Sequence, residues 1–141
     1  MKFKYQRINS AVRESLWHVV WCTKYRYKVF RKFHHKNLAE ACIRKAASRH
    51  NIEILEIQVM PDHVHLIIRL PICMSIEYAL QLLKGGSAFT FFRNAPKMHL
   101  RYHQGHLWSK GKFYSTIGYS DYPTTLDYLK NQEQYHALAG S

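Results

Sequence analysis

The chain has 141 residues, the length of one domain whose core needs neither disulfides nor a structural metal. Its 21 Lys and Arg against 9 Asp and Glu give a formal charge of +12, which favours a polyanionic partner, nucleic acid before an anionic membrane. No apolar run is long enough to span a bilayer and no secretory signal opens the chain, so we expect a cytoplasmic protein without a membrane partner.

The first predicted element is a strand over residues 15–23, where β-branched and aromatic side chains follow one another without a breaker. After it comes Lys-Tyr-Arg-Tyr-Lys at 24–28. In an extended backbone this run places three cations on one side and two tyrosines on the other. Such a run is often only a solvated edge, but it is also suited to binding phosphates.

A helix and a hairpin are predicted next. Apolar residues at helical spacing between 36 and 50 indicate an amphipathic helix that ends near Asn51. Residues 52–60 and 63–70 both have the composition of strands, and Pro61-Asp62 between them supplies a tight turn. We therefore expect the two strands to pair.

The second half of the chain predicts two helices and a strand. Ser75 is suited to cap a helix that Gly85-Gly86 would interrupt or kink, with a short helical piece over 87–93 after it. Residues 94–106 show no period and are expected to form a loop. Residues 107–118 predict a strand, and 124–135 a last helix, with Pro123 before its start and Thr124 as its cap.

The order β, α, β, β, α, β followed by a helix predicts an α+β fold. We expect a ferredoxin-like (RRM-like) α/β sandwich with an antiparallel sheet, two helices on one face and the opposite face free for a ligand. Residues 1–141 form a single domain, with a core over about 15–119 and a C-terminal helix over about 124–135.

Two histidines in the predicted strand 63–70 form a candidate metal site. His63 and His65 are two residues apart, so on a strand they point to the same face and can converge on one ion. The alternate positions form an apolar stripe that faces the helices: Val64, Leu66, Ile68 and Leu70. In a chain with ten histidines, two ordinary half-exposed histidines explain this motif as well, so it is weak by itself.

The last predicted helix carries a second pair. Tyr128 and Gln132 are four residues apart and so lie one turn apart on the same helical face. A tyrosine nucleophile and an amide ligand can therefore enter one site together. Taken singly, Tyr128 is more often a packing residue and Gln132 a solvated polar group.

Five ordered blocks of sequence resemble one known family. They are Trp-His-Val-Val-Trp-Cys-Thr-Lys-Tyr-Arg at 17–26, Met-Pro-Asp-His-Val-His-Leu at 60–66, Lys-Gly-Gly-Ser at 84–87, Leu-Trp-Ser-Lys-Gly at 107–111 and Tyr-Leu-Lys-Asn-Gln at 128–132. In order and content they resemble the single-tyrosine HUH transposases of insertion sequences, the TnpA type of the IS200-like family.

This resemblance implies a function and a set of site residues. His63, His65 and Gln132 would bind Mg²⁺ or Mn²⁺, and Tyr128 would be the catalytic nucleophile that forms a 5′-phosphotyrosine link to DNA. The enzyme would cleave and rejoin single-stranded DNA at hairpins that mark the ends of the element. It would act as a homodimer that exchanges the helices carrying Tyr128.

The basic side chains supply candidate contacts to DNA phosphates. These are Lys24, Arg26, Lys28, Arg31 and Lys32, with Lys84 and Lys110 near the catalytic face. Two other functions stay open at this point. One is a non-catalytic ferredoxin-like module that binds single-stranded nucleic acid, since basic charge and sheet aromatics also describe such domains. The other is a domesticated relative that cleaves hairpins but no longer moves an element.

Overall fold

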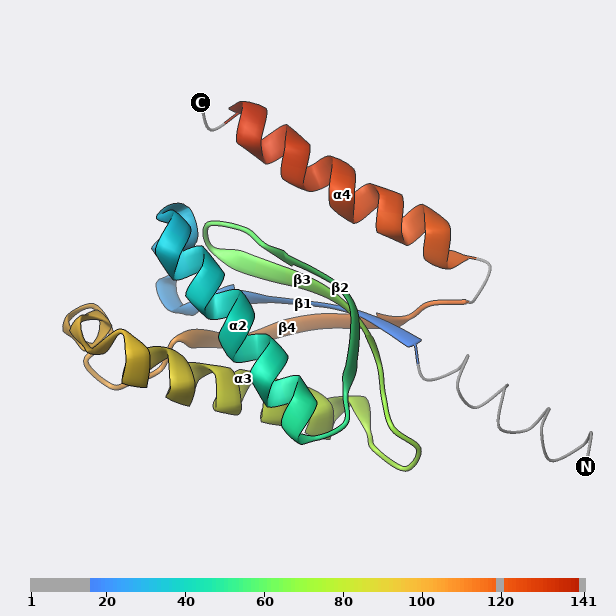
Figure 1. Ribbon diagram of the computed structural model, residues 1–141, viewed down its shortest axis with the longest axis horizontal. Helices are drawn as coiled ribbons and strands as arrows, with labels where there is room; N and C mark the ends of the chain where they lie inside the picture. The colour runs from blue at the N-terminus through green and yellow to red at the C-terminus, as the bar shows by residue number, and fades with distance from the viewer. Residues whose placement is uncertain (1–15, 119–120, 140–141) are drawn as a thin grey trace, which may run out of the picture.

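The computed structural model describes residues 16–118 and 121–139, and the side chains of the last helix as far as residue 131. Its strands and longer helices are β1 Leu16–Thr23, α2 Phe33–Arg49, β2 Glu53–Val59, β3 His63–Arg69, α3 Ile76–Asn94, β4 Trp108–Thr116 and α4 Tyr122–Ala139 (Figure 1). Three 3₁₀ turns lie between them, η1 Lys24–Arg26, η2 Val29–Arg31 and η3 Pro96–Leu100. No helix of the described residues is both long and apolar enough to cross a bilayer.

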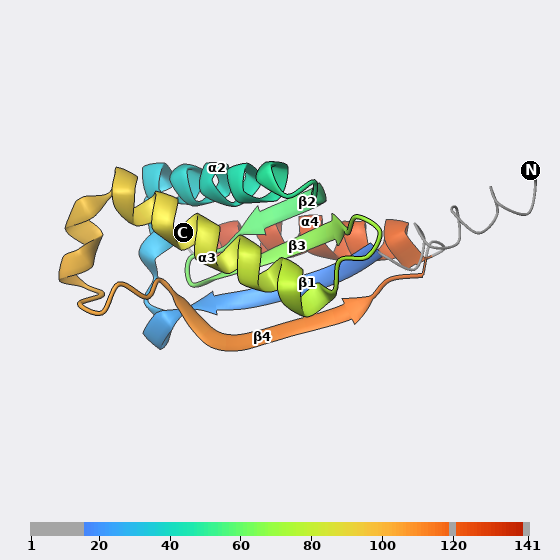
Figure 2. The same cartoon turned by 90° about the horizontal axis from the view of Figure 1, so that it is seen from below.

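The four strands form one antiparallel sheet in the order β2-β3-β1-β4. The two strands of the predicted hairpin, β2 and β3, are neighbours, and the returning chain brings β4 to the other side of β1. Helices α2 and α3 lie together on one face of this sheet (Figure 2). The predicted element order and the ferredoxin-like antiparallel α+β sandwich are therefore confirmed.

Strand alternation sorts the side chains between the two faces. Val64, Leu66 and Ile68 of β3 belong to the main core, where they meet buried residues of α2 and α3 such as Ile43 and Leu80. All five of these side chains are fully or almost fully buried. Burial of side chains of this size stabilises the fold by about 1.5–3 kcal/mol each, which holds the register of β3 and therefore the face on which its histidines lie.

The opposite face carries a smaller apolar cluster. It joins Leu16, Ile67 and Ile117 of the sheet region to Leu129 of α4, which is completely buried. Figure 1 shows α4 running beside the sheet, apart from α2 and α3. The face predicted to be free for a ligand is thus partly covered by α4 in the single chain.

The predicted break at Gly85-Gly86 is wrong, because α3 continues without interruption from Ile76 to Asn94. Gly86 lies against α2, where an added Cβ would stand 3.1 Å from the Cβ of Ala46. The missing side chain therefore allows the two helices to approach closely and does not end the helix. The predicted cap at Ser75 is present, since its side-chain oxygen accepts a hydrogen bond from the Tyr78 backbone N–H.

The last helix also differs from its predicted start. It begins at Tyr122, so Thr124 lies inside the first turn and is not the cap. Pro123 is accommodated there because the first residues of a helix have no N–H partner within the helix.

The extended basic run predicted at 24–28 is wrong. Lys24–Arg26 form a 3₁₀ turn in which Tyr25 and Arg26 have positive φ values of 63° and 54°. The Thr23 hydroxyl donates to the Tyr27 carbonyl, at 2.7 Å, and folds the backbone over the turn. The cations and tyrosines of this segment therefore do not alternate along a straight edge.

Candidate functional site

His63 and His65 lie on the same face of β3, as predicted from their spacing. Their ring centroids are 4.9 Å apart and the rings are inclined by 73°. β3 lies between β2 and β1, with His65 paired to Gln58 on one side and to Val20 on the other. His65 is buried and His63 partly buried, so both imidazoles are shielded from bulk water.

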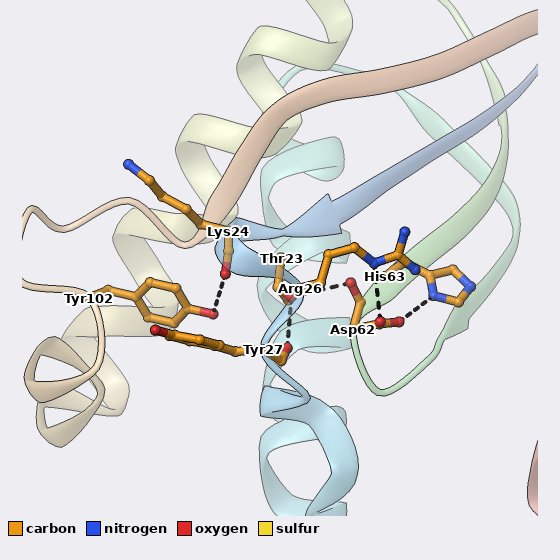
Figure 3. A network of polar contacts seen from close by, with 7 residues as sticks. All are labelled: Thr23, Lys24, Arg26, Tyr27, Asp62, His63 and Tyr102. Carbon is orange, nitrogen blue, oxygen red and sulfur yellow. Dashed lines mark hydrogen bonds and ion pairs between the residues drawn. The ribbon is translucent and has the colours of Figure 1, made fainter.

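The orientation of His63 is set by its neighbour Asp62. The Nδ1 atom of His63 lies 2.7 Å from Oδ1 of Asp62, as the close view shows (Figure 3). Since a carboxylate only accepts, Nδ1 carries a proton, and in the neutral ring the lone pair is then on Nε2. A carboxylate that fixes a histidine in this way is the usual outer partner of a metal-binding histidine.

Asp62 is itself held by a cation. Nε of Arg26 donates to the second carboxylate oxygen, at 3.2 Å, so that Arg26, Asp62 and His63 form one chain of contacts (Figure 3). Burial raises the pKa of the Asp62 carboxyl, but hydrogen bonds from His63 and Arg26 outweigh it and bring the pKa below the ordinary value. Asp62 is therefore ionised at neutral pH and acts as an acceptor.

A third imidazole stands beside the pair. His18 of β1 is stacked on His65, with ring centroids 5.6 Å apart and an interplanar angle of 12°. Its Nε2 is 3.4 Å from Nδ1 of His65, and the tautomer decides which ring donates. Burial lowers the pKa of His18, which favours the neutral ring at this position.

The turn after β1 is tied to the turn that precedes His63. The Thr23 backbone N–H donates to the Asp62 carbonyl at 2.9 Å, and the Phe30 N–H donates to the Pro61 carbonyl at 3.0 Å. The Thr23 hydroxyl is also 3.2 Å from the Asp62 carbonyl. The basic segment 24–32 is therefore fixed beside the histidine end of β3.

The donors at this place fit a divalent cation. Two imidazoles on one face, one with its tautomer set by a carboxylate, offer neutral nitrogen ligands to an ion such as Mn²⁺. Among the described residues, no group of three His, Cys, Asp or Glu is placed to hold a metal ion. The two histidines thus need further ligands, such as an amide or DNA oxygens, to complete a coordination shell.

Tyr128 lies on α4 with its side chain 57% exposed. The next residue, Leu129, packs beside Ile67, which is two positions from His65 on the same face of β3. Helix α4 therefore lies over the face that carries the histidines. Gln132 belongs to the same helix, and its side chain lies outside the described part of the chain, so its predicted role as a ligand stays a prediction.

The other predicted DNA contacts fall in two places. Lys28, Arg31 and Lys32 are exposed on the segment between β1 and α2, beside the histidine end of the sheet. Lys84 is on α3, where its ammonium donates to the Ser109 carbonyl at 2.7 Å, and Lys110 is exposed on β4. Burial lowers the pKa of Lys84, and its hydrogen bond to the Ser109 carbonyl holds the side chain between α3 and β4.

Asp62 and His18 were not identified as site residues from the sequence. The sequence indicates a turn residue at Asp62, and its position directly before His63 is also a signal of a partner for that histidine. His18 lies between Trp17 and Val19, and the alternation of the strand places it on the face opposite the buried Val19 and Trp21. What the sequence could not supply was the register that sets His18 beside His65.

Comparison with known proteins gives a consistent assignment. Residues 11–132 match the family described as IS200-like transposases. The chain is 29% identical over 117 residues to the transposase of insertion sequence element IS200 from Salmonella typhimurium, covering 82% of this chain and 75% of the relative. It is 28% identical over 116 residues to the ISDra2 transposase TnpA of Deinococcus radiodurans, covering 82% of each chain.

Solved structures agree with the sequence relatives. A crystal structure of a protein from Deinococcus radiodurans R1, described as a transposase, superposes with a TM-score of 0.65 at 28% identity, covering 83% of this chain and 89% of the other. A REP-associated tyrosine transposase bound to a REP hairpin shares the fold, with a TM-score of 0.65 at 17% identity, covering 89% of this chain and 70% of the other. The chain therefore belongs to the family of IS200-like transposases.

Proposed function

We propose that this transposase cleaves and rejoins single-stranded DNA at hairpin-marked ends, with a divalent metal at His63 and His65 and with Tyr128 as the nucleophile. The observation that carries the proposal is the pair of histidines on one sheet face, oriented by Asp62 and overlaid by the helix of Tyr128. Gln132, one turn after Tyr128 on the same helix, is the proposed third ligand.

The metal at this site is proposed to be Mg²⁺ or Mn²⁺. When bound, it supplies positive charge at a non-bridging phosphate oxygen and so lowers the barrier to nucleophilic attack. The residues of the chain hold it in place: Asp62 fixes His63, and His18 stacks on His65. Two neutral imidazoles leave room for phosphate oxygens and water among the ligands, which suits these ions.

Tyr128 is proposed to form the covalent link. Its phenolic oxygen attacks the phosphorus, an oxygen–phosphorus bond forms, and the bond to the 3′ oxygen breaks. The leaving oxygen takes a proton and becomes a free 3′-OH, while the 5′ side stays on Tyr128. Rejoining is the reverse step with a new 3′-OH. The exposed position of Tyr128 on α4 supports this role, because a strand of DNA can reach it.

The proposed DNA partner is a single strand that carries hairpins. The charge of +12 and the exposed cations Lys28, Arg31 and Lys32 beside the histidine end support phosphate binding there. A hairpin-bound relative of the same fold is in keeping with this substrate. Lys24, Arg26, Lys84 and Lys110 complete the proposed set of contacts.

The assay is incubation of the protein with single-stranded oligonucleotides that carry the hairpins flanking its gene, with Mn²⁺ or Mg²⁺. We expect a covalent protein–DNA band on a denaturing gel, lost in Tyr128→Phe and in the double variant His63→Ala, His65→Ala. The matched control is Tyr78→Phe, which alters another exposed tyrosine on the opposite layer and should keep the band. DNA binding that is independent of metal and gives no covalent product would instead identify a non-catalytic binding module.

We further propose a homodimer in which the α4 helices are exchanged, so that Tyr128 of one chain serves the histidines of the other. In the single chain, Leu129 packs on its own sheet, and the same apolar contact can form with a partner sheet. Mixing a Tyr128→Phe chain with the double histidine variant tests this arrangement. Restored cleavage supports exchange, and inactivity of a verified mixed dimer contradicts it.

A further inference from the structure

A hollow lies beside the turn after β1, and none of the proposed metal ligands or Tyr128 lines it. It has a volume of about 560 Å³ and is lined by side chains of the turn after β1 and of the 100–106 loop. We call it the tyrosine pocket, after Tyr25, Tyr27 and Tyr102, which all line it. Residues far apart in the sequence meet here, so the pocket is a product of the fold and not of one local turn.

The tyrosine rings pack together, and Tyr25 is the most exposed of the three. Tyr25 and Tyr102 are almost parallel, at 8° with centroids 6.4 Å apart, and Tyr27 contacts both at 5.3 and 5.6 Å. Tyr102 is buried, whereas Tyr25 is 63% exposed. The Tyr102 hydroxyl donates to the Lys24 carbonyl, and burial raises its pKa to about 12, so this hydroxyl keeps its proton and its contact (Figure 3).

The backbone holds Tyr25 in this exposed position against its own preference. Both Tyr25 and Arg26 adopt the left-handed conformation, which residues with a side chain seldom take. The contacts of Thr23 with Tyr27 and with Asp62 enforce this turn. Strain of this kind persists where the surrounding structure imposes it, and it is found most often at ligand-binding sites.

Cations surround the rings. The Lys24 ammonium lies 5.4 Å from the centre of the Tyr25 ring, and the Arg101 guanidinium lies 5.4 Å from the centre of the Tyr27 ring. His103 and His106 line the same pocket. A ligand that fits this combination has both a flat π face and a negative charge. A nucleotide has both, and stacking combined with cationic contacts is how proteins bind unpaired bases.

The pocket shares its turn with the histidine site. Arg26, which follows Tyr25, bonds Asp62, and Asp62 bonds His63 (Figure 3). The pocket and the histidine site are therefore joined through the turn after β1. We propose that the tyrosine pocket binds one unpaired nucleotide of single-stranded DNA, with its base stacked on Tyr25 and its phosphate near Lys24 and Arg101. This inference rests on the proposed function, because it assigns a step of DNA positioning to that site.

The experiment measures DNA binding in EDTA, so that no cleavage takes place. The probes are a fluorescent single strand of about 20 nucleotides, which spans one such binding site, and a blunt-ended duplex of two strands without unpaired residues. The variants are Tyr25→Leu, which keeps bulk without the ring, and Tyr25→Phe, which keeps the ring. Phe33→Leu is the matched control, since Phe33 is an aromatic residue 75% exposed at the start of α2, outside the pocket.

Tyr25→Leu removes the ring on which one base stacks. We therefore expect its affinity for the single strand to be about 5- to 150-fold lower than that of the unaltered protein. Tyr25→Phe and Phe33→Leu should bind the single strand within about twofold of the unaltered protein, and all variants should bind the blunt-ended duplex alike. In the unaltered protein, a 2-aminopurine base at one position of the strand should be quenched on binding, and excess free mononucleotide should not displace the strand. Displacement by mononucleotide would overturn the assignment to DNA in favour of a free nucleotide.

Single-strand binding by Tyr25→Leu that equals that of the unaltered protein would overturn the proposal. Quenching at no position of the strand would overturn it as well, even if the variant did not fold. These results leave the proposed function intact, because that function is judged by the covalent band at Tyr128 in the presence of metal. Conversely, absence of that band with normal binding in EDTA contradicts the proposed function and leaves the pocket in place.

Discussion

Asp62→Ala is expected to lower the apparent affinity of the cleavage reaction for its metal more than it lowers the stability of the fold. Asp62 makes two contacts through its carboxylate, at 2.7 Å to His63 and at 3.2 Å to Arg26. The His63 and Asp62 side chains are only 14% and 20% exposed, whereas Arg26 is 63% exposed. A charge-assisted hydrogen bond in a shielded place contributes about 1.5–3 kcal/mol, while an exposed ion pair contributes about 0–1 kcal/mol.

The contact with His63 is therefore the larger of the two. Removing such an outer partner of a metal ligand costs about 10- to 100-fold in metal affinity or activity, which corresponds to about 1.4–2.7 kcal/mol and so agrees with the value for the bond itself. Asp62→Asn should recover most of the activity, because its amide oxygen can still accept from Nδ1 of His63.

The assay is the initial rate of covalent-complex formation measured against the concentration of Mn²⁺. For Asp62→Ala, the Mn²⁺ concentration that gives half of the maximal rate should rise by about 10- to 100-fold. The free energy of unfolding, measured in urea, separates this effect from loss of fold. An unchanged Mn²⁺ dependence in a folded Asp62→Ala protein would refute the reasoning that Asp62 positions His63.

Three further predictions concern the fold and its pH dependence. Gly86→Val should lower the free energy of unfolding in urea by about 1–3 kcal/mol, since an added Cβ stands 3.1 Å from that of Ala46, while Gly85→Val, with nothing within 4 Å, should not destabilise. Ser75→Ala should cost about 0.5–2 kcal/mol through loss of the cap on Tyr78 N–H, seen as a lower Tm, and an unchanged Tm would contradict it. The lowered pKa of Asp62 means that its stabilisation is present above the pKa of an unfolded aspartate and is lost as the pH falls through the lower folded value. The free energy of unfolding, measured in urea, should therefore fall more between pH 5 and pH 2 in the unaltered protein than in Asp62→Asn, roughly the range in which such carboxylates titrate.

The fold was predictable where periodicity and turn chemistry act locally. The apolar alternation of Val64, Leu66 and Ile68 fixed both the strand and the face of its histidines, and Ser75 marked the start of α3. Gly86 predicts a break that α3 does not have, because a glycine inside a helix can serve close packing of two helices as well as a break. Only the partner residue Ala46, forty positions earlier in the chain, distinguishes the two.

The candidate site was predictable only in part. The spacing of His63 and His65 follows from the strand period, but the contacts that orient them come from elsewhere. His18 reaches His65 through the register between β1 and β3, and Arg26 reaches Asp62 only because the backbone turns at Tyr25. The predicted extended conformation of residues 24–28 does not include this turn. The positive φ at Tyr25 is imposed by hydrogen bonds of Thr23, and local sequence preferences do not predict these contacts.

The most direct test of the central claim is to locate the covalent link in the chain. The protein is allowed to react with hairpin-bearing single-stranded DNA and Mn²⁺, digested with protease and nuclease, and the modified peptide is sequenced by mass spectrometry. We predict a nucleotide joined through its 5′ phosphate to Tyr128, formed only with metal and absent from the double variant His63→Ala, His65→Ala. A link at any other residue, or the same link formed in full without metal, would contradict the account.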